Sequence, residues 1–346
     1  HIQMKLKQWS LLAALTVTLP LAACGGDDGA SSTSDAPATS EAPSTSEGGS
    51  VFVTGSSTVE PISIKVGELA GTAEGGNLKV TVEGPGTGDG FKKFCAGDSD
   101  ITGASRAIKE EEATLCADAG IEYIELAVAI DGLTVATSPA NTAIECLDKA
   151  ALYALVGPES EGFSSWADAN AIAGELGSAF ASLPDAPLSI YGPGEESGTY
   201  DSFVEFAFKS ISEDRGTDMV SRADYTASPN DNVIVDGIES ADTSLGWVGY
   251  AYYKAEEARM KAIAIADKEG ACVLPTDETI ADGSYPFSRT LYIYVNKAKA
   301  VENPAIAAYV DLYLSAQGGE QVSAAGYVQL DSATQQLSLD AWTARG

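Results

Sequence analysis

GPGEESGTYDSFVEFAF, residues Gly192–Phe208, joins a glycine-rich loop to a run whose apolar residues recur at helical spacing. The first amides of a helix have no intrahelical partner and carry the positive end of the helix dipole, so this stretch can bind an anion. Ser197 and Thr199 can add hydroxyl donors, and Gly198 has no side chain that would hold an anion away. The alternative is that Ser197 or Thr199 only caps the helix, with Asp201 favourably placed in the first turn.

Two earlier segments repeat this pattern of strand, small-residue loop and helix. A strand at Val51–Thr54 is followed by Gly55–Thr58 and by a helix with Pro61 near its first turn. A second strand at Leu78–Glu83 leads through the loop Gly84–Gly90 into another helix. Three such loops predict three helix N-termini directed at one small anion in the cleft of an open α/β sheet.

The size and charge of the chain narrow the classes of partner. At 346 residues, with 45% hydrophobic residues, the chain can fill the cores of two lobes. Its formal charge of -30 excludes nucleic acid as a partner and predicts a solvated acidic surface. A bound anion must therefore be held by local dipoles and one well-placed cation, because the overall field opposes it.

The N-terminus has the features of an export signal. Lysines precede an apolar run at Leu11–Leu19, and LAAC follows at Leu21–Cys24, which is typical of a bacterial lipoprotein box. We expect residues 1–23 to be a signal peptide and Cys24 to be the lipidated first residue of the mature protein. The alternative is an ordinary signal peptide with an incidental cysteine. Residues 24–50 then hold the body to the outer face of the membrane, in the periplasm or at the cell surface, as a tether with a reach of roughly 25–30 Å.

The order of the remaining segments predicts a discontinuous two-lobed body. Strands at Ile121–Ala129 and Leu133–Ser138 are separated by Asp131-Gly132, which indicates a crossing between lobes, and the β-rich run Tyr285–Val295 returns the chain. Lobe 1 is predicted to contain residues 51–133 and 290–346, and lobe 2 residues 134–289. Further helices are predicted at Glu145–Val156, Asn170–Ala181, Asn232–Glu239, Pro304–Leu314, Gly319–Ala325 and Ser332–Arg345.

Four cysteines remain in the body, and an even number in an exported protein predicts disulfides. Three pairings can be drawn. Cys95 with Cys116 and Cys146 with Cys272 is the pairing that keeps each bond within one lobe. The chain has no CxxC motif and no histidine-containing cluster, so neither a zinc site nor another cofactor is expected.

Arg106 is the only basic residue in a loop of the anion-binding kind. The segment Asp100–Arg106 reads as a short strand that ends before an acidic helix at Lys109–Ala119. Arg106 either supplies a cation to the cleft or pairs at the surface with the run Glu110–Glu112. Its position alone leaves both interpretations open.

Five motifs together resemble the PstS family, the phosphate-binding lipoproteins of the high-affinity phosphate ABC importer: Gly55–Pro61, Gly86–Phe94, Gly103–Ile108, Ser197–Thr199 and Gly246–Tyr252. The resemblance covers residues 51–330 in the same order. It implies an α/β periplasmic-binding-protein fold of type II, with two lobes that close on one phosphate. It also implies a membrane permease as partner and no chemical reaction.

The resemblance also implies a set of phosphate donors, which are Ser57, Thr58, Thr87, Gly88, Ser197, Gly198 and Thr199. Pro193 stands where relatives commonly have an arginine, and Arg106 stands where they have an aspartate. We infer that Arg106 supplies the cation from the opposite lobe. The acceptor for the phosphate proton is then unassigned, and Asp89 and Asp231 are candidates by loop position.

Other functions stay open at this point. Sulfate is the nearest rival ligand, because a site made only of donors does not require a protonated anion. A serine-dependent hydrolase has little support, since the only histidine is His1 and no GxSxG motif occurs, although a Ser–Lys dyad is not excluded. A passive surface lipoprotein would bind no oxyanion. We expect a monomeric binding protein rather than an enzyme.

Overall fold

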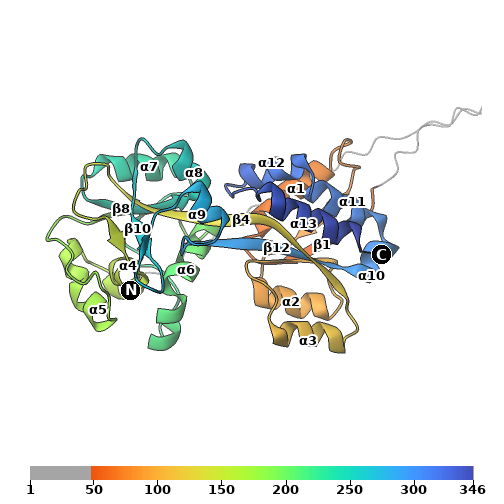
Figure 1. The fold of residues 1–346 in the computed structure, drawn as a ribbon, viewed down its shortest axis with the longest axis horizontal. Helices are drawn as coiled ribbons and strands as arrows, with labels where there is room; N and C mark the ends of the chain where they lie inside the picture. The colour runs from red at the N-terminus through yellow and green to blue at the C-terminus, as the bar shows by residue number, and fades with distance from the viewer. Residues whose placement is uncertain (1–47, 346) are drawn as a thin grey trace, which may run out of the picture. The chain divides into compact units, whose positions relative to one another are not determined.

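The computed structural model describes residues 48–345, so the predicted signal peptide, Cys24 and nearly all of the tether lie outside the described residues. The described residues form a mixed α/β fold in which helices pack around a curled sheet (Figure 1). Among residues 48–345, no helix combines the length and the apolar character that crossing a membrane requires.

The strands have the following bounds: β1 Ser50–Gly55, β2 Lys79–Val82, β3 Ile101–Ala104, β4 Tyr123–Thr137, β5 Cys146–Leu147, β6 Ser189–Gly192, β7 Thr226–Ala227, β8 Ser244–Gly249, β9 Lys261–Ala262, β10 Ala264–Ala266, β11 Cys272–Val273 and β12 Ser288–Asn296. The helices have these bounds: α1 Glu60–Ala70, α2 Thr87–Cys95, α3 Glu110–Asp118, α4 Lys149–Val156, α5 Asn170–Glu175, α6 Gly198–Arg215, α7 Asp231–Ser240, α8 Tyr250–Ala255, α9 Asp277–Ala281, α10 Lys297–Glu302, α11 Pro304–Tyr313, α12 Ala316–Ala324 and α13 Ser332–Thr343. Short 3-10 turns occur at Pro158–Ser160 and Trp166–Ala169.

Strands β4 and β12 connect the two halves of the sheet, whose order is β2-β1-β3-β12-β4-β8-β6-β7 (Figure 1). β4 is one continuous strand of 15 residues, whereas the sequence predicted a break at Asp131-Gly132. The strand continues because it changes partner there. Its first part pairs with β12, and from Leu133 onward it pairs with β8 through Gly249.

The apolar cores separate at the same crossing. One cluster contains buried residues from 51–129 and 291–342, and another contains buried residues from 130–287. The predicted lobes, residues 51–133 with 290–346 and residues 134–289, stay a prediction.

Both predicted disulfides are present, Cys95–Cys116 and Cys146–Cys272. The helix predicted at Glu145–Val156 begins later than expected, at Lys149. Cys146 and Leu147 instead pair in parallel with β10. The Asp148 side chain then caps α4 by accepting a hydrogen bond from the Ala151 amide at 2.7 Å.

Two other predicted helices have different bounds. The helix predicted at Asn170–Ala181 ends at Glu175, and the helix predicted at Gly319–Ala325 begins earlier, at Ala316. The Ser315 side chain caps that earlier start by accepting a hydrogen bond from the Gly318 amide. Helix ends depend on such local caps, which apolar spacing does not show.

Candidate functional site

The start of α6 has the predicted form, with a glycine-rich loop that leads directly into the helix. Ser197 is the N-cap residue, and its Oγ accepts a hydrogen bond from the Thr199 amide at 3.2 Å. Among residues 48–345, the amides of Gly198 and Tyr200 have no backbone acceptor. Ser197 therefore caps the helix, while backbone donors at the positive end of the dipole stay available to an anion.

The loop before α1 faces the same helix start. Thr58 is buried, and its amide donates to the Ser56 side chain at 3.1 Å. The Ser57 side chain lies near the carboxylate of Asp201, in the first turn of α6, and acts to lower the pKa of Asp201. Ser57 therefore lies between the starts of two helices.

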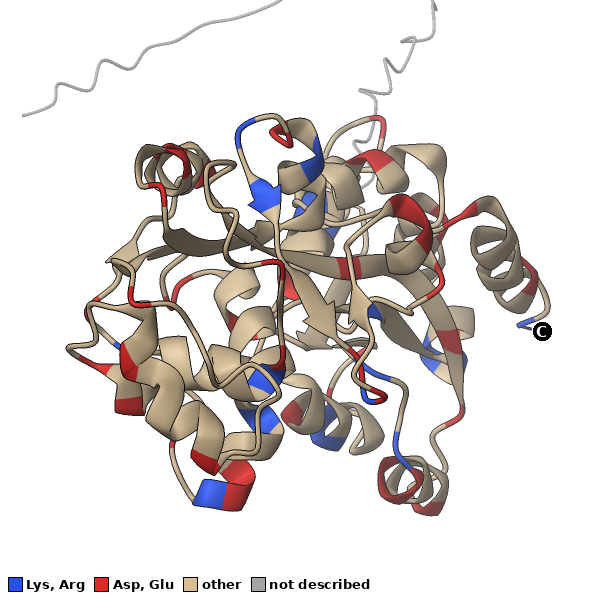
Figure 2. Ribbon diagram, turned by 60° about the vertical axis from the view of Figure 1, so that its left-hand side comes forward, with Lys and Arg blue, Asp and Glu red and all other residues tan. Residues whose placement is uncertain are grey.

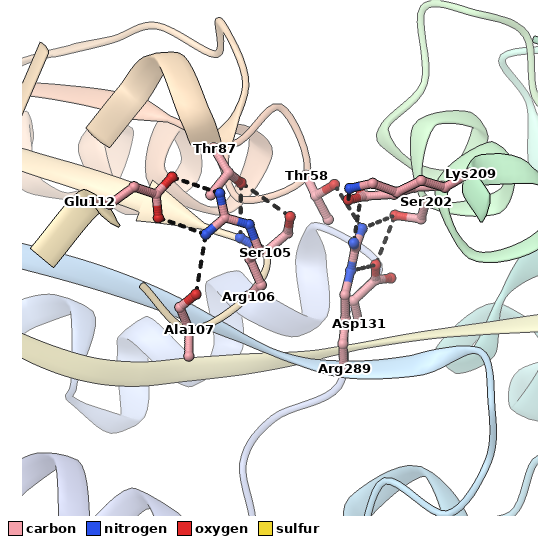
Figure 3. Close-up of polar contacts among 11 residues, drawn as sticks. Thr58, Thr87, Ser105, Arg106, Ala107, Glu112, Asp131, Ser202, Lys209 and Arg289 are labelled. Atoms are coloured by element: carbon pink, nitrogen blue, oxygen red, sulfur yellow. Dashed lines mark hydrogen bonds and ion pairs between the residues drawn. The ribbon is translucent and has the colours of Figure 1, made fainter. Parts of the chain in front are cut away.

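Thr87 and Gly88 are the first two residues of α2, which begins inside the segment Gly84–Gly90 that the sequence predicted as a loop. The first helical hydrogen bond runs from the Gly90 amide to the Gly86 carbonyl at 2.9 Å, so the amides before it are unpaired within the helix. The Thr87 hydroxyl lies 3.1 Å from the Ser105 hydroxyl and accepts a hydrogen bond from the Ser105 amide (Figure 3). The start of α2 is thereby attached to the loop that carries Arg106.

Arg106 is held by Glu112 in two parallel hydrogen bonds of 2.8 and 2.7 Å, and it also donates to the Ala107 carbonyl (Figure 3). The hydrogen bonds to Glu112 raise the pKa of Arg106. The side chains are only 29% and 15% exposed, so this is not a loose surface pair. The structure thus contains the acidic-helix contact that the sequence left open. The Arg106 Nε and the second N–H of Nη2 form no hydrogen bond within residues 48–345, so these two donors remain for a ligand.

A second arginine, which no sequence motif predicted, lies where the strands cross. Arg289 on β12 is opposite Asp131 on β4, and its Nε donates to that carboxylate at 3.2 Å. Its Nη1 donates to Glu205 on α6, and its Nη2 lies 3.4 Å from the hydroxyl groups of both Thr58 and Ser202. Arg289 therefore joins a crossing strand to α6 and to the loop before α1 (Figure 3).

The surroundings of Arg289 keep it charged and ordered. Its side chain is 15% exposed, and its guanidinium lies 4.6 Å from the centre of the Phe206 ring. Burial opposes the charge, but the carboxylates of Asp131 and Glu205 raise the pKa of Arg289. In the sequence, Arg289 was marked only by being the single charged residue within the β-rich run Tyr285–Val295.

The two aspartates predicted as proton acceptors lie in different environments. Asp89 is exposed and pairs with Lys92 at 2.8 Å, and these contacts lower its pKa. Asp231 lies at the start of α7, where partial burial raises its pKa. Asp201 is a third carboxylate, whose pKa is raised by burial and by Glu205 although the Ser57 side chain opposes the shift.

A cavity of about 480 Å³ adjoins the start of α6. It is lined by Pro61, Pro193, Glu196, Ser197, Gly198, Thr199, Ser228, Pro229, Asp231, Gly249, Ala251, Tyr252, Ala255, Ser323, Ala325, Gly326 and Tyr327. A side chain at Gly198 would lie 2.9 Å from the Tyr327 hydroxyl and 3.7 Å from the Ser57 carbonyl. The two halves of the fold therefore meet at the first residue of α6. Of the phosphate ligands predicted from the sequence, the cavity lining includes Ser197, Gly198 and Thr199 and does not include Ser57, Thr58, Thr87, Gly88 or Arg106.

Comparisons with known proteins identify the family. The model of the PBP superfamily domain matches residues 40–317. Protein SphX of Synechocystis sp. is 38% identical and aligns with 81% of this chain and 78% of its own length. The phosphate-binding protein PstS of Staphylococcus aureus is 32% identical and aligns with 97% of this chain and 92% of its own length.

Solved structures agree with this relationship. The crystal structure of a possible phosphate binding protein from Planctomyces limnophilus matches with a TM-score of 0.78 and 38% identity, covering 87% of this chain and 99% of that one. PstS from Borrelia burgdorferi matches with a TM-score of 0.56 and 21% identity, covering 82% of this chain and 99% of that one, which supports the fold alone. The chain therefore belongs to the PBP superfamily and, within it, to the family of the PstS and SphX proteins.

Proposed function

We propose that this chain captures inorganic phosphate outside the cytoplasm and delivers it to the membrane permease of an ABC-type importer. The named function of the Staphylococcus aureus relative supports the ligand, and that relative aligns with nearly the whole chain. The proposal describes a binding protein that performs no reaction. Sulfate is the alternative cargo, and a serine-dependent hydrolase is the alternative of another class.

The observation that carries the proposal is the set of backbone amides that have no backbone acceptor within residues 48–345. They belong to Ser57 in the loop before α1, to Thr87 and Gly88 at the start of α2, and to Gly198 and Tyr200 at the start of α6. Acidic side chains are spread over many helices and loops (Figure 2), so the overall charge of -30 cannot attract an anion. Helix N-termini attract an anion locally in spite of that charge. The proposed ligands are Ser57, Thr58, Thr87, Gly88, Ser197, Gly198 and Thr199, with Arg106 as cation.

The hydrogen bonds in the site refine this proposal. The Thr87 hydroxyl already contacts the Ser105 hydroxyl, so Thr87 is proposed to bind phosphate chiefly through its amide, as is Ser57. The Ser197 amide already donates to the Gly194 carbonyl at 3.0 Å, but the Ser197 hydroxyl only accepts a hydrogen bond, from the Thr199 amide, and can still donate to the anion. The Thr87 hydroxyl would fix its loop in the geometry that points the Thr87 amide at the anion.

Membrane attachment and closure complete the proposal. We propose that Cys24 carries the lipid, that the monomeric body hangs from the tether of residues 24–50, and that the lobes close on phosphate about β4 and β12. Closure would bring together donors from both lobes. Residues 1–23 would be removed as the signal peptide.

Isothermal titration of the protein with phosphate, arsenate and sulfate tests the function. The proposal expects one saturable phosphate site per chain and weaker binding of sulfate. Tighter binding of sulfate than of phosphate would show that sulfate is the cargo. Turnover of an ester substrate that disappears in Ser197→Ala would instead support the hydrolase.

Replacing Gly198 with alanine is predicted to weaken phosphate binding by about tenfold or more, which corresponds to about 1.4 kcal/mol. The new methyl group would fill the space between α6 and the Tyr327 hydroxyl. Titration of Gly198→Ala with phosphate measures this change. Gly174→Ala is the matched control, because Gly174 is exposed on α5 and a Cβ there meets only Ala181, at 3.9 Å. Equal affinities for both variants would contradict the prediction.

Replacing Asp201 with asparagine is predicted to reduce the preference for phosphate over sulfate by about tenfold. The half-buried Asp201 carboxylate can accept the proton of a phosphate monoanion or dianion, and it repels a fully ionised sulfate. Competition titrations with both anions measure the ratio. Asp231→Asn and Asp89→Asn test the two candidates predicted from the sequence. If Asp201→Asn keeps the parent's ratio while Asp231→Asn loses it, Asp231 is the acceptor instead.

A further inference from the structure

Tyr327 is a buried tyrosine that the backbone holds firmly beside the crossing strand β4. The residue is 7% exposed, and its amide donates to the Val322 carbonyl at the end of α12. The next residue, Val328, exchanges two backbone hydrogen bonds of 2.8 and 2.9 Å with Ile130. Ile130 immediately precedes Asp131, so Tyr327 is fixed to the strand that carries the Arg289 partner.

The Tyr327 hydroxyl points across the cleft at the start of α6. A Cβ placed on Gly198 would lie 2.9 Å from this hydroxyl, and Tyr327 lines the cavity beside that helix. Within residues 48–345 the hydroxyl has no hydrogen-bond partner. The other buried tyrosines of the same core do have partners, because Tyr309 donates to the Ser63 carbonyl and Tyr313 lies 3.1 Å from the Ser63 hydroxyl.

The surroundings keep the Tyr327 hydroxyl protonated. Burial raises the pKa of Tyr327 first, and the nearby carboxylates of Asp131 and Asp201 raise it further, while Arg289 opposes them. A protonated hydroxyl is a donor, and because Tyr327 lines the cavity, this donor can reach an acceptor on a ligand bound there. The acceptor that belongs at a helix N-terminus is an anion.

We propose that Tyr327 donates a hydrogen bond to the oxyanion bound at the start of α6. This inference rests on the proposed function and adds a specific ligand to it, one from the segment after α12 that none of the predicted motifs contains. Because Tyr327 belongs to the core of lobe 1 and α6 to lobe 2, the bound anion would join the lobes through this contact.

Tyr327→Phe removes only the hydroxyl and keeps the ring that packs in the core. Phosphate affinity, measured by isothermal titration, should fall about tenfold or more. The unfolding midpoint without phosphate should be unchanged, because the variant keeps the packed ring and loses no hydrogen bond within the described residues. A structural role alone would lower that midpoint and leave the affinity unchanged.

Tyr309→Phe is the matched control, since it also removes one buried hydroxyl from the same core. It loses the hydrogen bond to Ser63, so its unfolding midpoint should fall while its phosphate affinity stays that of the parent. A Tyr327→Phe variant whose phosphate affinity lies within about threefold of the parent's would overturn the inference and leave the proposed function intact.

The parent protein separates this failure from a failure of the proposed function. If the parent binds sulfate and not phosphate, the cargo is wrong, and a tenfold loss of sulfate affinity in Tyr327→Phe would still support the contact. If the parent binds neither phosphate, arsenate nor sulfate, both the function and the Tyr327 contact are overturned.

Discussion

Arg289→Ala is expected to lower the free energy of unfolding by about 3–5 kcal/mol, the cost of breaking a buried ion pair from one side. The change leaves Asp131, which is 4% exposed, without its cation and deprives Glu205 of its guanidinium partner. It also removes a contact between β12 and the loop before α1, at Thr58. Urea unfolding of the parent and the variant near pH 7 measures the loss.

The pH dependence of this loss identifies its cause. Burial already raises the pKa of Asp131, and without Arg289 it should rise further. A carboxyl group whose folded pKa is raised favours the folded state at low pH, and this contribution is lost as the pH rises through the folded value. The stability deficit of Arg289→Ala should therefore be smaller near pH 5 than near pH 7.

Arg259→Ala provides a matched control at the surface. Arg259 contacts Asp236, Glu239 and Glu256, but these contacts are exposed, and surface pairs contribute little. Its loss of stability should be much smaller than that of Arg289→Ala. Equal losses in the two variants would show that Arg289 is not a buried connection between the halves of the fold.

Arg106→Ala is expected to weaken phosphate binding by at least about thirtyfold, because a charge-assisted hydrogen bond to a desolvated anion is lost. Glu112 accepts one N–H from each terminal nitrogen of Arg106, so the proposed contact uses Nε and the second N–H of Nη2 while Glu112 holds the guanidinium in place. Arg106→Lys should recover only part of the loss, because a point charge cannot contact Glu112 and phosphate as a fork.

Glu112→Gln separates the binding role from the structural one. If Arg106 binds phosphate, this variant should keep more affinity than Arg106→Ala, because the cation is still present. If Arg106 only pairs with Glu112, both variants should lose similar stability and keep the parent's affinity. Arg106→Ala that binds phosphate within about threefold of the parent would exclude Arg106 as the cation.

Local sequence signals predicted much of the fold. The loop and helix at Gly192–Phe208 form as expected because glycines, a serine cap and helical apolar spacing act over a few residues. The two disulfides followed from one assumption, that each bond stays within a lobe. The family resemblance then placed these local units in one known arrangement.

Features that depend on distant pairing were missed. Asp131 and Arg289 are 158 residues apart and meet only because β4 and β12 pair in one register, which no local pattern encodes. Cys146 appeared helical because its strand partner, β10, lies far along the chain. Tyr327 was missed for the same reason, since its hydroxyl faces Gly198 across the cleft.

The contact of Arg106 with Glu112 shows a different limit. These residues are six positions apart, so the sequence already contained both the acidic partner and the cleft as alternatives. The structure shows the pair, but a guanidinium has five N–H donors and can contact a carboxylate and an anion together.

A crystal structure of the protein with phosphate tests the central claim most directly. The account predicts one phosphate between the lobes, with its oxygens about 2.7–3.2 Å from the Ser57 amide and from amides at the starts of α2 and α6. The Tyr327 hydroxyl and the Nε or Nη2 of Arg106 should be at the same distance from it. A phosphate bound away from the start of α6, or contacting only one lobe, would contradict the account.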